Sequence, residues 1–351
     1  MNLLKSVGSV LAVAVVLLVG LYLAGFIGPP SASIADEGDW GTVSQDRTEV
    51  VTTLAVENPN PLGISIGERL SAAYRVSMND VRVASGEQTG LEVPSGTSRM
   101  ELSTYIDNDR IPPWWVAFVR ADETLRVNLT GEIRATAFGL SSSTAFPAQE
   151  RTMLENETPI IASMSEAIGE LEGTYTTEET VGTEPVTETV TVGYEVERAW
   201  ATWGTVNRSS TEVLFHVRLH NPSERIPVPA APDGLTSTIE MNDVALVDVE
   251  GEGVGVRNLD RDAVIPPGET REVVYVAVMD NEQVDDWFRR HVERGERSNV
   301  EVRTSLLFDV PRTGTTIRVP EDGPVTVMCA FQTAMLVDDQ ETATTCGAPG
   351  A

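Results

Sequence analysis

The chain has 351 residues and carries 53 acidic against 25 basic side chains, a formal net charge of −28 at pH 7. This balance excludes nucleic acid as a partner, because phosphate backbones bind to basic faces. A hydrophobic content of 41% argues against a disordered acidic chain. Lys5 is the one lysine, and an acidic surface almost without lysine is typical of adaptation to molar salt, where a Debye length of about 3 Å weakens repulsion between carboxylates. We therefore interpret the source as an extremely halophilic archaeon.

The first element in chain order is an uncharged hydrophobic stretch at residues 7–27. As a helix it would span about 31 Å, enough to cross the core of a bilayer. Because a secretory signal has a shorter apolar region, residues 1–27 predict an uncleaved transmembrane anchor, with cleavage near Ser33-Ile34-Ala35 as the alternative. Positive charges precede the stretch and acidic residues follow it. The positive-inside rule then places the amino terminus in the cytoplasm and everything after the linker at 28–39 outside the cell.

Short segments of the first half return in the second half at a constant offset of 163 residues, which becomes 173 after an insertion of ten residues. The matched segments are residues 40–43 with 203–206, 79–81 with 242–244, and 107–108 with 280–281. Such self-similarity indicates a duplicated structural module. We predict one copy over residues 40–150 and the other over residues 193–320.

Within each copy, alternating apolar and polar residues predict short strands, for example at 51–56 and 213–220. One short helix per copy is predicted by residues spaced at i, i+3, i+4 and i+7, which we expect to anchor the core. These residues are Ile111, Trp114, Trp115 and Phe118, and then Val284, Trp287, Phe288 and His291. Short strands, one helix and Pro/Gly turns indicate a mainly β fold with two tandem antiparallel β-sandwiches.

Two further segments lie outside the copies. Residues 151–192 are predicted to hold a short helix at 159–171 and a solvated Thr/Glu-rich connector at 174–191, the end of which is an alternative first strand for the second copy. The tail at residues 321–351 contains Cys329 and Cys346, which could close one disulfide outside the cell.

The predicted strands 51–56 and 213–220 both run into an Asn-Pro pair, where proline removes a ladder donor. The first copy reads Asn58-Pro59-Asn60-Pro61 and the second Asn221-Pro222, followed there by Ser223-Glu224. With the apolar stretch that follows and a Pro-x-Gly turn ahead of a Val-rich strand, each copy resembles the water-stress and hypersensitive-response (WHy) domain of the late-embryogenesis-abundant type 2 proteins. The resemblance implies an immunoglobulin/fibronectin-III-like sandwich for each copy and a role in tolerance of water stress or desiccation. It supplies no active site.

The residue patterns do not point to catalysis. His216 and His220 fall on one strand face about 13 Å apart, too far to share a metal ion, so we expect them on a solvated face. The acidic clusters at 107–109 and 260–262 lack the ligand spacing of a calcium loop, and the glycine-rich segment 251–255 lacks the context of a phosphate loop. A nucleophile elbow and a triad pattern are both missing. We therefore predict a protein that is not an enzyme and has neither a metal nor a cofactor.

Three sequons for N-glycosylation occur, at Asn128, Asn156 and Asn207. Asn207 falls in a predicted turn and is the best placed, and Asn128 is a second candidate. Pro159 directly follows the sequon of Asn156 and disfavours it.

The resemblance and the acidic surface together predict a membrane-anchored protein that supports survival at low water activity. Its expected partners are the membrane, through one span, and cell-surface proteins or lipids. The alternative is a cell-surface adhesion or scaffold module, in which loops or edge strands bind a partner. A further alternative is a lipid-binding module that holds a hydrophobic molecule between its layers.

Overall fold

The computed structural model describes residues 31–58, 64–65, 70–89, 92–137, 140–183, 185–252, 255–257, 259–260, 263–311, 313–335 and 340–347. The chain divides into two compact units. The first unit comprises Met1–Glu157, Phe288–Glu296 and Thr333–Glu341, and the second comprises Thr158–Trp287, Arg297–Gln332 and Thr342–Ala351. The boundary between the units therefore differs from the boundary between the predicted copies, since two segments from the second half of the chain belong to the first unit.

The predicted anchor at residues 1–27 lies outside the described residues. Among the helices of the described ranges, none is both long and apolar enough to span a membrane. Strand β1 (Ser31–Val43) begins inside the predicted linker at 28–39 and pairs antiparallel with β2 (Arg47–Asn58). The sheet thus starts earlier than the sequence pattern predicts, because the acidic residues of β1 do not alternate with apolar ones.

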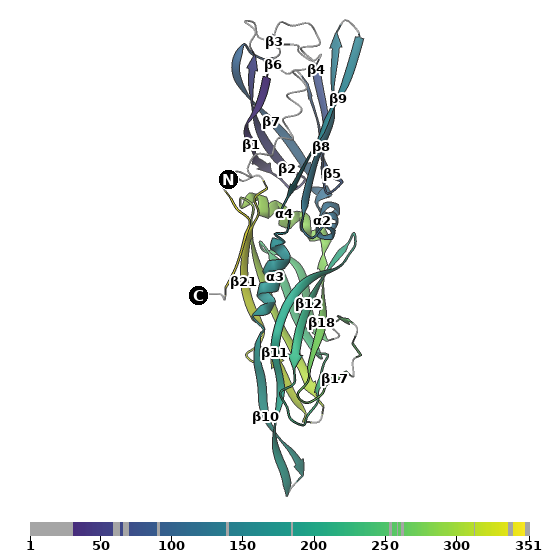
Figure 1. Ribbon diagram of the computed structural model, residues 1–351, viewed down its shortest axis with the longest axis vertical. Helices are drawn as coiled ribbons and strands as arrows, with labels where there is room; N and C mark the ends of the chain where they lie inside the picture. The colour runs from purple at the N-terminus through teal and green to yellow at the C-terminus, as the bar shows by residue number, and fades with distance from the viewer. Residues whose placement is uncertain are drawn as a thin grey trace. The chain divides into compact units, whose positions relative to one another are not determined.

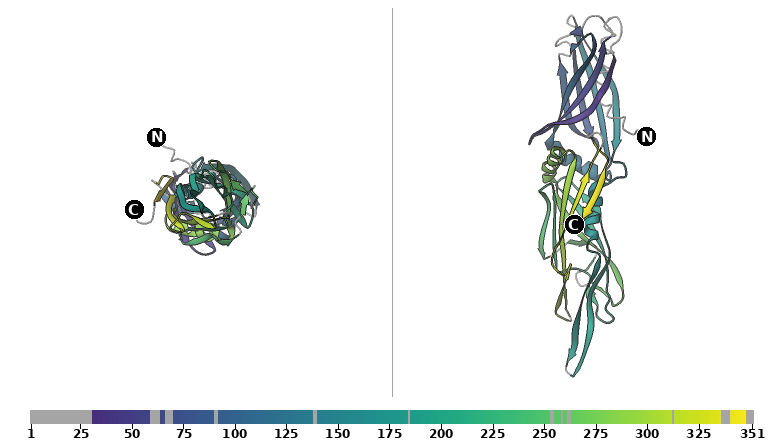
Figure 2. Two further views of the ribbon diagram at one scale, coloured as in Figure 1. Left: turned by 90° about the horizontal axis from the view of Figure 1, so that it is seen from below. Right: turned by 90° about the vertical axis from the view of Figure 1, so that its left-hand side faces the viewer.

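The first unit is built mainly from one seven-stranded sheet with the order β1-β2-β7-β5-β4-β8-β9, whose long strands run side by side in purple and blue (Figures 1 and 2). A two-stranded sheet, β3-β6, and the helical residues 111–120 and 288–293 also belong to the described part of this unit. Its remaining elements are β3 (Ile64–Ser65), β4 (Leu70–Met78), β5 (Val81–Thr89), β6 (Glu92–Val93), β7 (Gly96–Asp107), η2 (Asn108–Arg110), α2 (Ile111–Arg120), β8 (Leu125–Ala137) and β9 (Leu140–Met153).

The second unit contains a five-stranded sheet ordered β10-β11-β12-β18-β16, a six-stranded sheet formed by β15-β14-β19-β21-β22 with β20 beside β19, and the pair β13-β17. Helix α4 (Val284–Glu293) starts in this unit, and its residues from Phe288 onward belong to the first. The other elements are α3 (Pro159–Gly169), β10 (Gly173–Thr183), β11 (Val186–Val206), β12 (Ser210–His220), β13 (Val228–Pro229), β14 (Gly234–Met241), β15 (Val244–Glu252), β16 (Gly255–Arg257), β17 (Val264–Ile265), β18 (Thr270–Asp280), η3 (Asn281–Gln283), β19 (Arg297–Val310), β20 (Thr315–Val319), β21 (Val325–Gln332) and β22 (Ala343–Gly347).

Residues matched by the repeat occupy corresponding places in the structure. The hairpins β4–β5 and β14–β15 both turn on Asn-Asp, with φ of 46° and 65° at Asn79-Asp80 and of 50° and 62° at Asn242-Asp243. Two successive positive φ angles define the turn that matches the twist of a hairpin, and Asn and Asp tolerate them best. The matched segments 79–81 and 242–244 thus form the same Asn-Asp turn in both halves.

The aromatic stripes of the two predicted helices lie in the core. Trp115 and Ile111 of α2 are fully buried, and Trp287 and Phe288 of α4 are 3% and 1% exposed. In the second unit, the ring of Tyr194 on β11 lies 4.3 Å from the ring of Phe308 on β19, so side chains of the five-stranded and six-stranded sheets are in contact. The elements of the described residues, mostly strands with few helices, confirm the predicted mainly β fold.

The segment predicted as a solvated connector at 174–191 is instead a β-hairpin. Strand β10 pairs residue by residue with the first part of β11, and the hairpin extends beyond the rest of the second unit in Figure 1. The composition rich in Thr and Glu suggested a coil, but the many β-branched Thr and Val residues favour a strand, and side-chain exposure alternates along most of β10. The short helix predicted at 159–171 is present as α3.

Helix α3 lies along the part of β11 that has no strand partner on one side. Strand β10 pairs with β11 only as far as Val196, and β12 occupies the opposite edge. On the open edge, Ala201 N donates to Ser165 Oγ of α3 at 3.2 Å, and Ala199 N donates to Glu172 Oε1 just beyond the helix at 3.1 Å. Side chains thus accept the hydrogen bonds that a neighbouring strand would otherwise accept.

Candidate functional site

A carboxylate closes the same strand irregularity in each copy. The backbone N–H of Thr42 donates to Glu49 Oε2 at 3.0 Å, and that of Thr205 donates to Glu212 Oε2 at 2.7 Å. In both copies the threonine follows a glycine, where an added Cβ would lie only 2.8 Å from an atom of the glutamate. The repeated Trp-Gly-Thr-Val segment therefore has a structural explanation, because its glycine and threonine contact a glutamate on the next strand of the same copy.

Two asparagines of each copy also bind their own backbone. Asn79 Nδ2 donates to a carbonyl at 2.8 Å and Asn242 Nδ2 to the corresponding one at 3.0 Å. Asn108 and Asn281 each accept a hydrogen bond from a threonine hydroxyl, at 2.9 and 2.7 Å. All four side chains are at most 5% exposed. The polar residues that recur in both copies thus hold turns together and are turned away from solvent.

The Asn-Pro motif has the same character where the structure describes it. Asn221 is fully buried, its Nδ2 donates to the carbonyls of Ile226 and Ile265 at 2.8 and 2.9 Å, and its Oδ1 accepts from Ser223 N at 3.0 Å. Pro222, directly after it, is partly exposed. In the first copy, Asn58 ends β2 opposite Gly96, and Pro59, Asn60 and Pro61 lie outside the described residues. In the second copy, Asn221 therefore closes a loop through its side chain.

The copies differ on one face of the central strand pair. In the second copy, β12 and β18 place His216 opposite Val274 and Leu214 opposite Val276. In the first copy, the same register of β2 and β7 pairs Thr53 with Glu101 and Val51 with Ser103. Strand β11 adds Trp200 opposite His216, whereas the first copy has Asp36 opposite Thr53. We call the following residues the second-copy patch: Trp200, Leu214, His216, Val274, Val276 and Val278. The corresponding residues on β2 and β7 are Val51, Thr53, Glu101, Ser103 and Tyr105.

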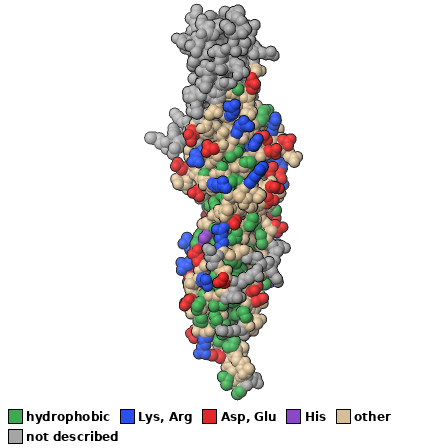
Figure 3. Space-filling view, turned by 90° about the vertical axis from the view of Figure 1, so that its right-hand side faces the viewer, with side chains coloured by type: hydrophobic (Ala, Val, Ile, Leu, Met, Phe, Trp, Pro, Cys, Tyr) green, Lys and Arg blue, Asp and Glu red, His purple; other side chains and the backbone are tan. Residues whose placement is uncertain are grey.

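The second-copy patch is partly open to solvent. Val278 is 51% exposed, and the other members are half-buried. Figure 3 views the side on which Figure 1 draws β18, and hydrophobic side chains are visible there among acidic and arginine side chains. The residues at these register positions are thus more apolar in the second copy than in the first, which makes the second-copy patch a candidate interaction surface.

The centre of the patch is an aromatic stack. The rings of Trp200 and His216 lie 4.9 Å apart and are inclined by only 10°. The guanidinium of Arg198 lies 4.8 Å from the centre of the Trp200 ring, within the range of a cation–π interaction. Three planar groups are therefore held in a fixed arrangement on a rigid sheet.

Two hydrogen bonds fix the orientation of His216. Its Nδ1 lies 3.0 Å from Glu272 Oε1, and its Nε2 lies 2.9 Å from Thr202 Oγ1. Because a carboxylate only accepts hydrogen bonds, Nδ1 donates its hydrogen to Glu272. His216 is thus a polar member of the surface whose ring is held in position by two hydrogen bonds.

His220 lies on the same strand but takes part in a separate network. Its Nδ1 lies 3.1 Å from Thr270 Oγ1, which itself donates to Glu197 Oε1 at 3.1 Å. Over the described ranges, the structure shows no group of three His, Cys, Asp or Glu residues arranged to hold a metal ion. The two histidines that the sequence singles out are therefore not brought together.

Hydrogen bonds and burial shift several pKa values. The hydroxyl of Ser103 and the backbone N–H of Thr42 donate hydrogen bonds to the ionised carboxylate of Glu49 and so lower its pKa. Burial raises the pKa of Glu212, but hydrogen bonds and the positive charge of Arg257 outweigh it, so that the pKa is lowered overall. Burial raises the pKa of Tyr275, which stays neutral. These shifts describe structural groups and do not assemble an acid and a base around a cleft.

A buried carboxylate in the first unit escapes the sequence analysis. Glu296 is fully buried at a left-handed φ of 59°. Its carboxylate accepts hydrogen bonds from Trp40 Nε1 at 3.0 Å, Thr333 Oγ1 at 2.9 Å and Met335 N at 2.6 Å. Glu123 occupies the matching place after α2, equally buried and with the same φ of 59°. The offset of 173 residues between the two glutamates was the available signal.

His291 extends this network. It is 1% exposed, and its Nε2 lies 2.9 Å from Thr333 Oγ1. Since the threonine donates its hydrogen to Glu296, it must accept from the histidine. The sequence places His291 in the helical stripe expected to anchor the core, and the residue is buried. The network ties Thr333 and Met335 to Glu296, and Thr333 to His291 of α4.

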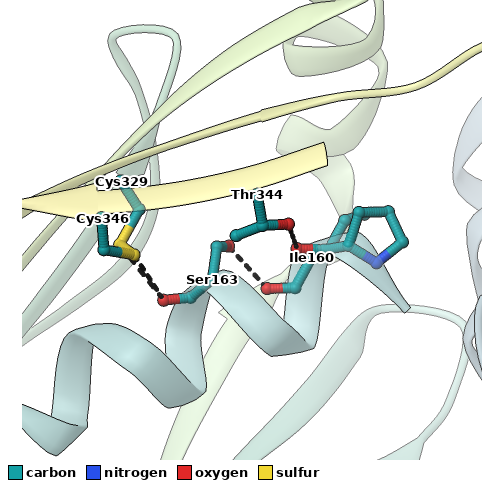
Figure 4. Close-up of a disulfide and its surroundings, with 6 residues drawn as sticks. Ile160, Ser163, Cys329, Thr344 and Cys346 are labelled. Carbon is teal, nitrogen blue, oxygen red and sulfur yellow. Dashed lines mark hydrogen bonds between the residues drawn. A yellow bond between two sulfur atoms is a disulfide. The ribbon is translucent and has the colours of Figure 1, made fainter. Parts of the chain in front are cut away.

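Cys329 and Cys346 are joined in a disulfide between adjacent strands β21 and β22 (Figure 4). Their Cα atoms lie 4.1 Å apart, and Cys329 is 2% exposed. Figure 4 shows both sulfur atoms facing the carbonyl oxygen of Ser163 on α3, at 3.3 and 3.7 Å. The bridge therefore holds the last strand, yellow in Figure 2, against both β21 and α3.

The sequon asparagines lie in different settings. Asn207 is exposed in the turn between β11 and β12. Asn128 is half-buried within β8, paired with Ser77 on one side and Glu150 on the other.

Sequence reasoning missed the second-copy patch, although comparison of the two copies position by position would have shown it.

Residues 53–150 match the family model described as late embryogenesis abundant protein. These residues run from β2 into β9 and lie within the first predicted copy. The match supports the resemblance to late-embryogenesis-abundant type 2 proteins that the Asn-Pro motif indicates.

Similarity to individual proteins is more distant. The chain is 25% identical over 136 residues to the uncharacterized protein MJ1138 of Methanocaldococcus jannaschii, covering 38% of this chain and 76% of that protein. A crystal structure of a protein from Archaeoglobus fulgidus is similar at 21% identity and a TM-score of 0.28, covering 36% of this chain and 95% of that one. An anti-sigma factor domain-containing protein is similar at 10% identity and a TM-score of 0.16, covering 85% and 92%. Both TM-scores are too low to support an argument.

Proposed function

We propose that the chain is a non-enzymatic, membrane-anchored protein whose two WHy-like modules, each a β-sandwich, support tolerance of water stress in an extreme halophile. The observation that carries the proposal is the family match of residues 53–150. The net charge of −28 supports it, because exposed carboxylates hold water and hydrated cations at low water activity. The repeated polar residues support it as well, since they bond their own backbone and leave the solvated surface to act.

Deletion of the gene tests this proposal. The deletion strain is dried or shifted to higher osmolarity, and its survival is compared with that of strains complemented by the full chain and by a chain lacking residues 1–27. We expect reduced survival of the deletion strain and rescue by the full chain only. Unchanged survival of the deletion strain contradicts the function, whereas rescue by the shortened chain contradicts only the need for an anchor. Protease treatment of intact cells, with loss of both modules, tests the external location.

The second-copy patch favours a second candidate function, a scaffold that binds another cell-surface protein. Val278 and Tyr105 provide matched variants, since they occupy corresponding positions and are 51% and 47% exposed. In a pull-down from crosslinked membranes, a scaffold recovers one stoichiometric partner. Val278→Glu should abolish this recovery and Tyr105→Glu should leave it intact. Equal recovery with both variants, or no stoichiometric partner, contradicts the scaffold.

A further inference from the structure

The turn between β11 and β12 presents an asparagine where the corresponding turn of the first copy has a serine. Asn207 N donates to Ser210 O at 2.9 Å, and Ser44 N donates to Arg47 O at 2.9 Å in the matching turn. Ser44 Oγ donates to Arg47 O at 2.9 Å and accepts from Arg47 N at 3.1 Å. A hydroxyl is thus sufficient to close this turn, so its geometry does not require the carboxamide of the second copy.

The carboxamide of Asn207 is held in a defined orientation by the sequon itself. Its Oδ1 accepts hydrogen bonds from Ser209 N at 3.0 Å, from Ser209 Oγ at 3.1 Å and from Ser210 N at 3.1 Å. Its Nδ2 donates one hydrogen to Ser210 Oγ at 2.8 Å. All three donors polarise the carbonyl side of the amide, and the side chain is exposed to solvent. The hydroxyl that defines an Asn-x-Ser sequon is therefore already bonded to the asparagine that would be modified.

The other two sequons are less favourable. Asn128 lies inside a strand that has a partner on each side, so its backbone cannot leave the sheet to enter an enzyme without breaking two ladders. Asn156 is exposed at a left-handed φ of 64°, but its sequon threonine, Thr158, leads directly into Pro159 at the start of α3. The proline fixes the backbone there and restricts the residue before it.

We propose that Asn207 is the N-glycosylation site of this chain, with an oligosaccharide transferred from a lipid phosphate carrier. This inference rests on the proposed external location of the modules. In the transfer, Nδ2 forms a bond to the anomeric carbon of the sugar while the bond from that carbon to the phosphate oxygen breaks. The lipid phosphate leaves with that electron pair, and Nδ2 gives one proton to a base of the transferase. The oligosaccharide then projects from an exposed hairpin turn, where it displaces no packed side chain.

Mass spectrometry of the full chain, purified from membranes of its own host, tests the site. Cleavage after arginine releases residues 199–208, which contain Asn207 and neither of the other sequons. We expect this peptide to carry the added mass of one or more sugars. Asn207→Ser and Ser209→Ala should each abolish the addition, whereas Ser209→Thr and Asn128→Ser should retain it. Asn207→Ser is also the matched folding control, because it reproduces the turn of Ser44.

An unmodified residue 207 in the wild-type chain overturns the inference, as does modification that persists in Ser209→Ala. Protease treatment of the same intact cells separates the two levels of the argument. Digestion of the modules together with an unmodified Asn207 refutes glycosylation while leaving the external location standing. Protection of the modules together with an unmodified Asn207 refutes both.

Discussion

Removal of the disulfide between Cys329 and Cys346 should destabilise the second unit by an amount that follows from the length of the loop it closes. The two cysteines are 17 residues apart. For a loop of this length, the entropy withheld from the unfolded chain corresponds to about 3 kcal/mol of unfolding free energy at 25 °C. The double change Cys329→Ser with Cys346→Ser suits the test, because the hydroxyl at position 329 can donate to the carbonyl of Ser163, which the sulfur now faces at 3.3 Å.

Hydrogen exchange measured by mass spectrometry is the appropriate assay, since a chain with two compact units does not unfold in one step. The most protected amides of β19 and β21 report opening of the second unit. A loss of about 3 kcal/mol should accelerate their exchange about a hundredfold. Amides of β8 in the first unit serve as the internal control and should change little.

Alkylation of free thiols must first show that the wild-type bridge is formed. Reduction of the wild-type chain should then reproduce the exchange of the double variant. Acceleration of less than about threefold would refute the reasoning, because it would mean that the bridge does not restrict the unfolded chain. Acceleration confined to β22 would also contradict it, since only local fraying would then depend on the bond.

Four further results are expected. Gly204→Ala should cost about 1–3 kcal/mol of unfolding free energy, because the added Cβ would lie 2.8 Å from the Cβ of Glu212. Gly41→Ala should cost less, since its added Cβ would meet the flexible end of the Glu49 side chain. Equal costs of the two variants in denaturant titrations would contradict this reasoning. Asn221→Ala leaves three backbone groups without their hydrogen-bond partner and should lower the unfolding free energy by at least about 3 kcal/mol. A fall in melting temperature no larger than that of a surface variant would contradict the structural role of Asn221. The lowered pKa of Glu49 means that its stabilising effect is present at neutral pH and lost as the pH falls below about 4. Glu49→Gln should therefore flatten the dependence of stability on pH in acid. An unaltered dependence of stability on pH would contradict this role of Glu49. Tyr275 has a buried hydroxyl that bonds no other described residue, so Tyr275→Phe should raise stability by about 1 kcal/mol, and a loss would reveal a hidden partner.

Much of the secondary structure could be predicted from local patterns. Among the described residues, both Asn-Asp hairpins and the helices α2, α3 and α4 follow from turn chemistry and from the spacing of apolar residues. These signals are short in range, because a turn or a helical face is defined within about ten residues. The mainly β character followed from the same reasoning.

The remaining features depend on contacts between distant segments. The hairpin of β10 and β11 has the Thr/Glu-rich composition of a solvated coil, although its many β-branched Thr and Val residues favour a strand. Glu296 finds Trp40 across 256 residues, a pairing that no local pattern encodes. The second-copy patch is visible only when β12 and β18 are compared with β2 and β7 in register.

The position of α3 beside the unpaired edge of β11 has a consequence for neighbouring molecules. A bare strand edge offers a row of amide and carbonyl groups on which a second chain can extend the sheet, and this is how many β proteins aggregate. Ser165 and Glu172 occupy two of those amides with side chains from the same molecule. Crowding on a surface would therefore bring copies together without offering them this edge for joining.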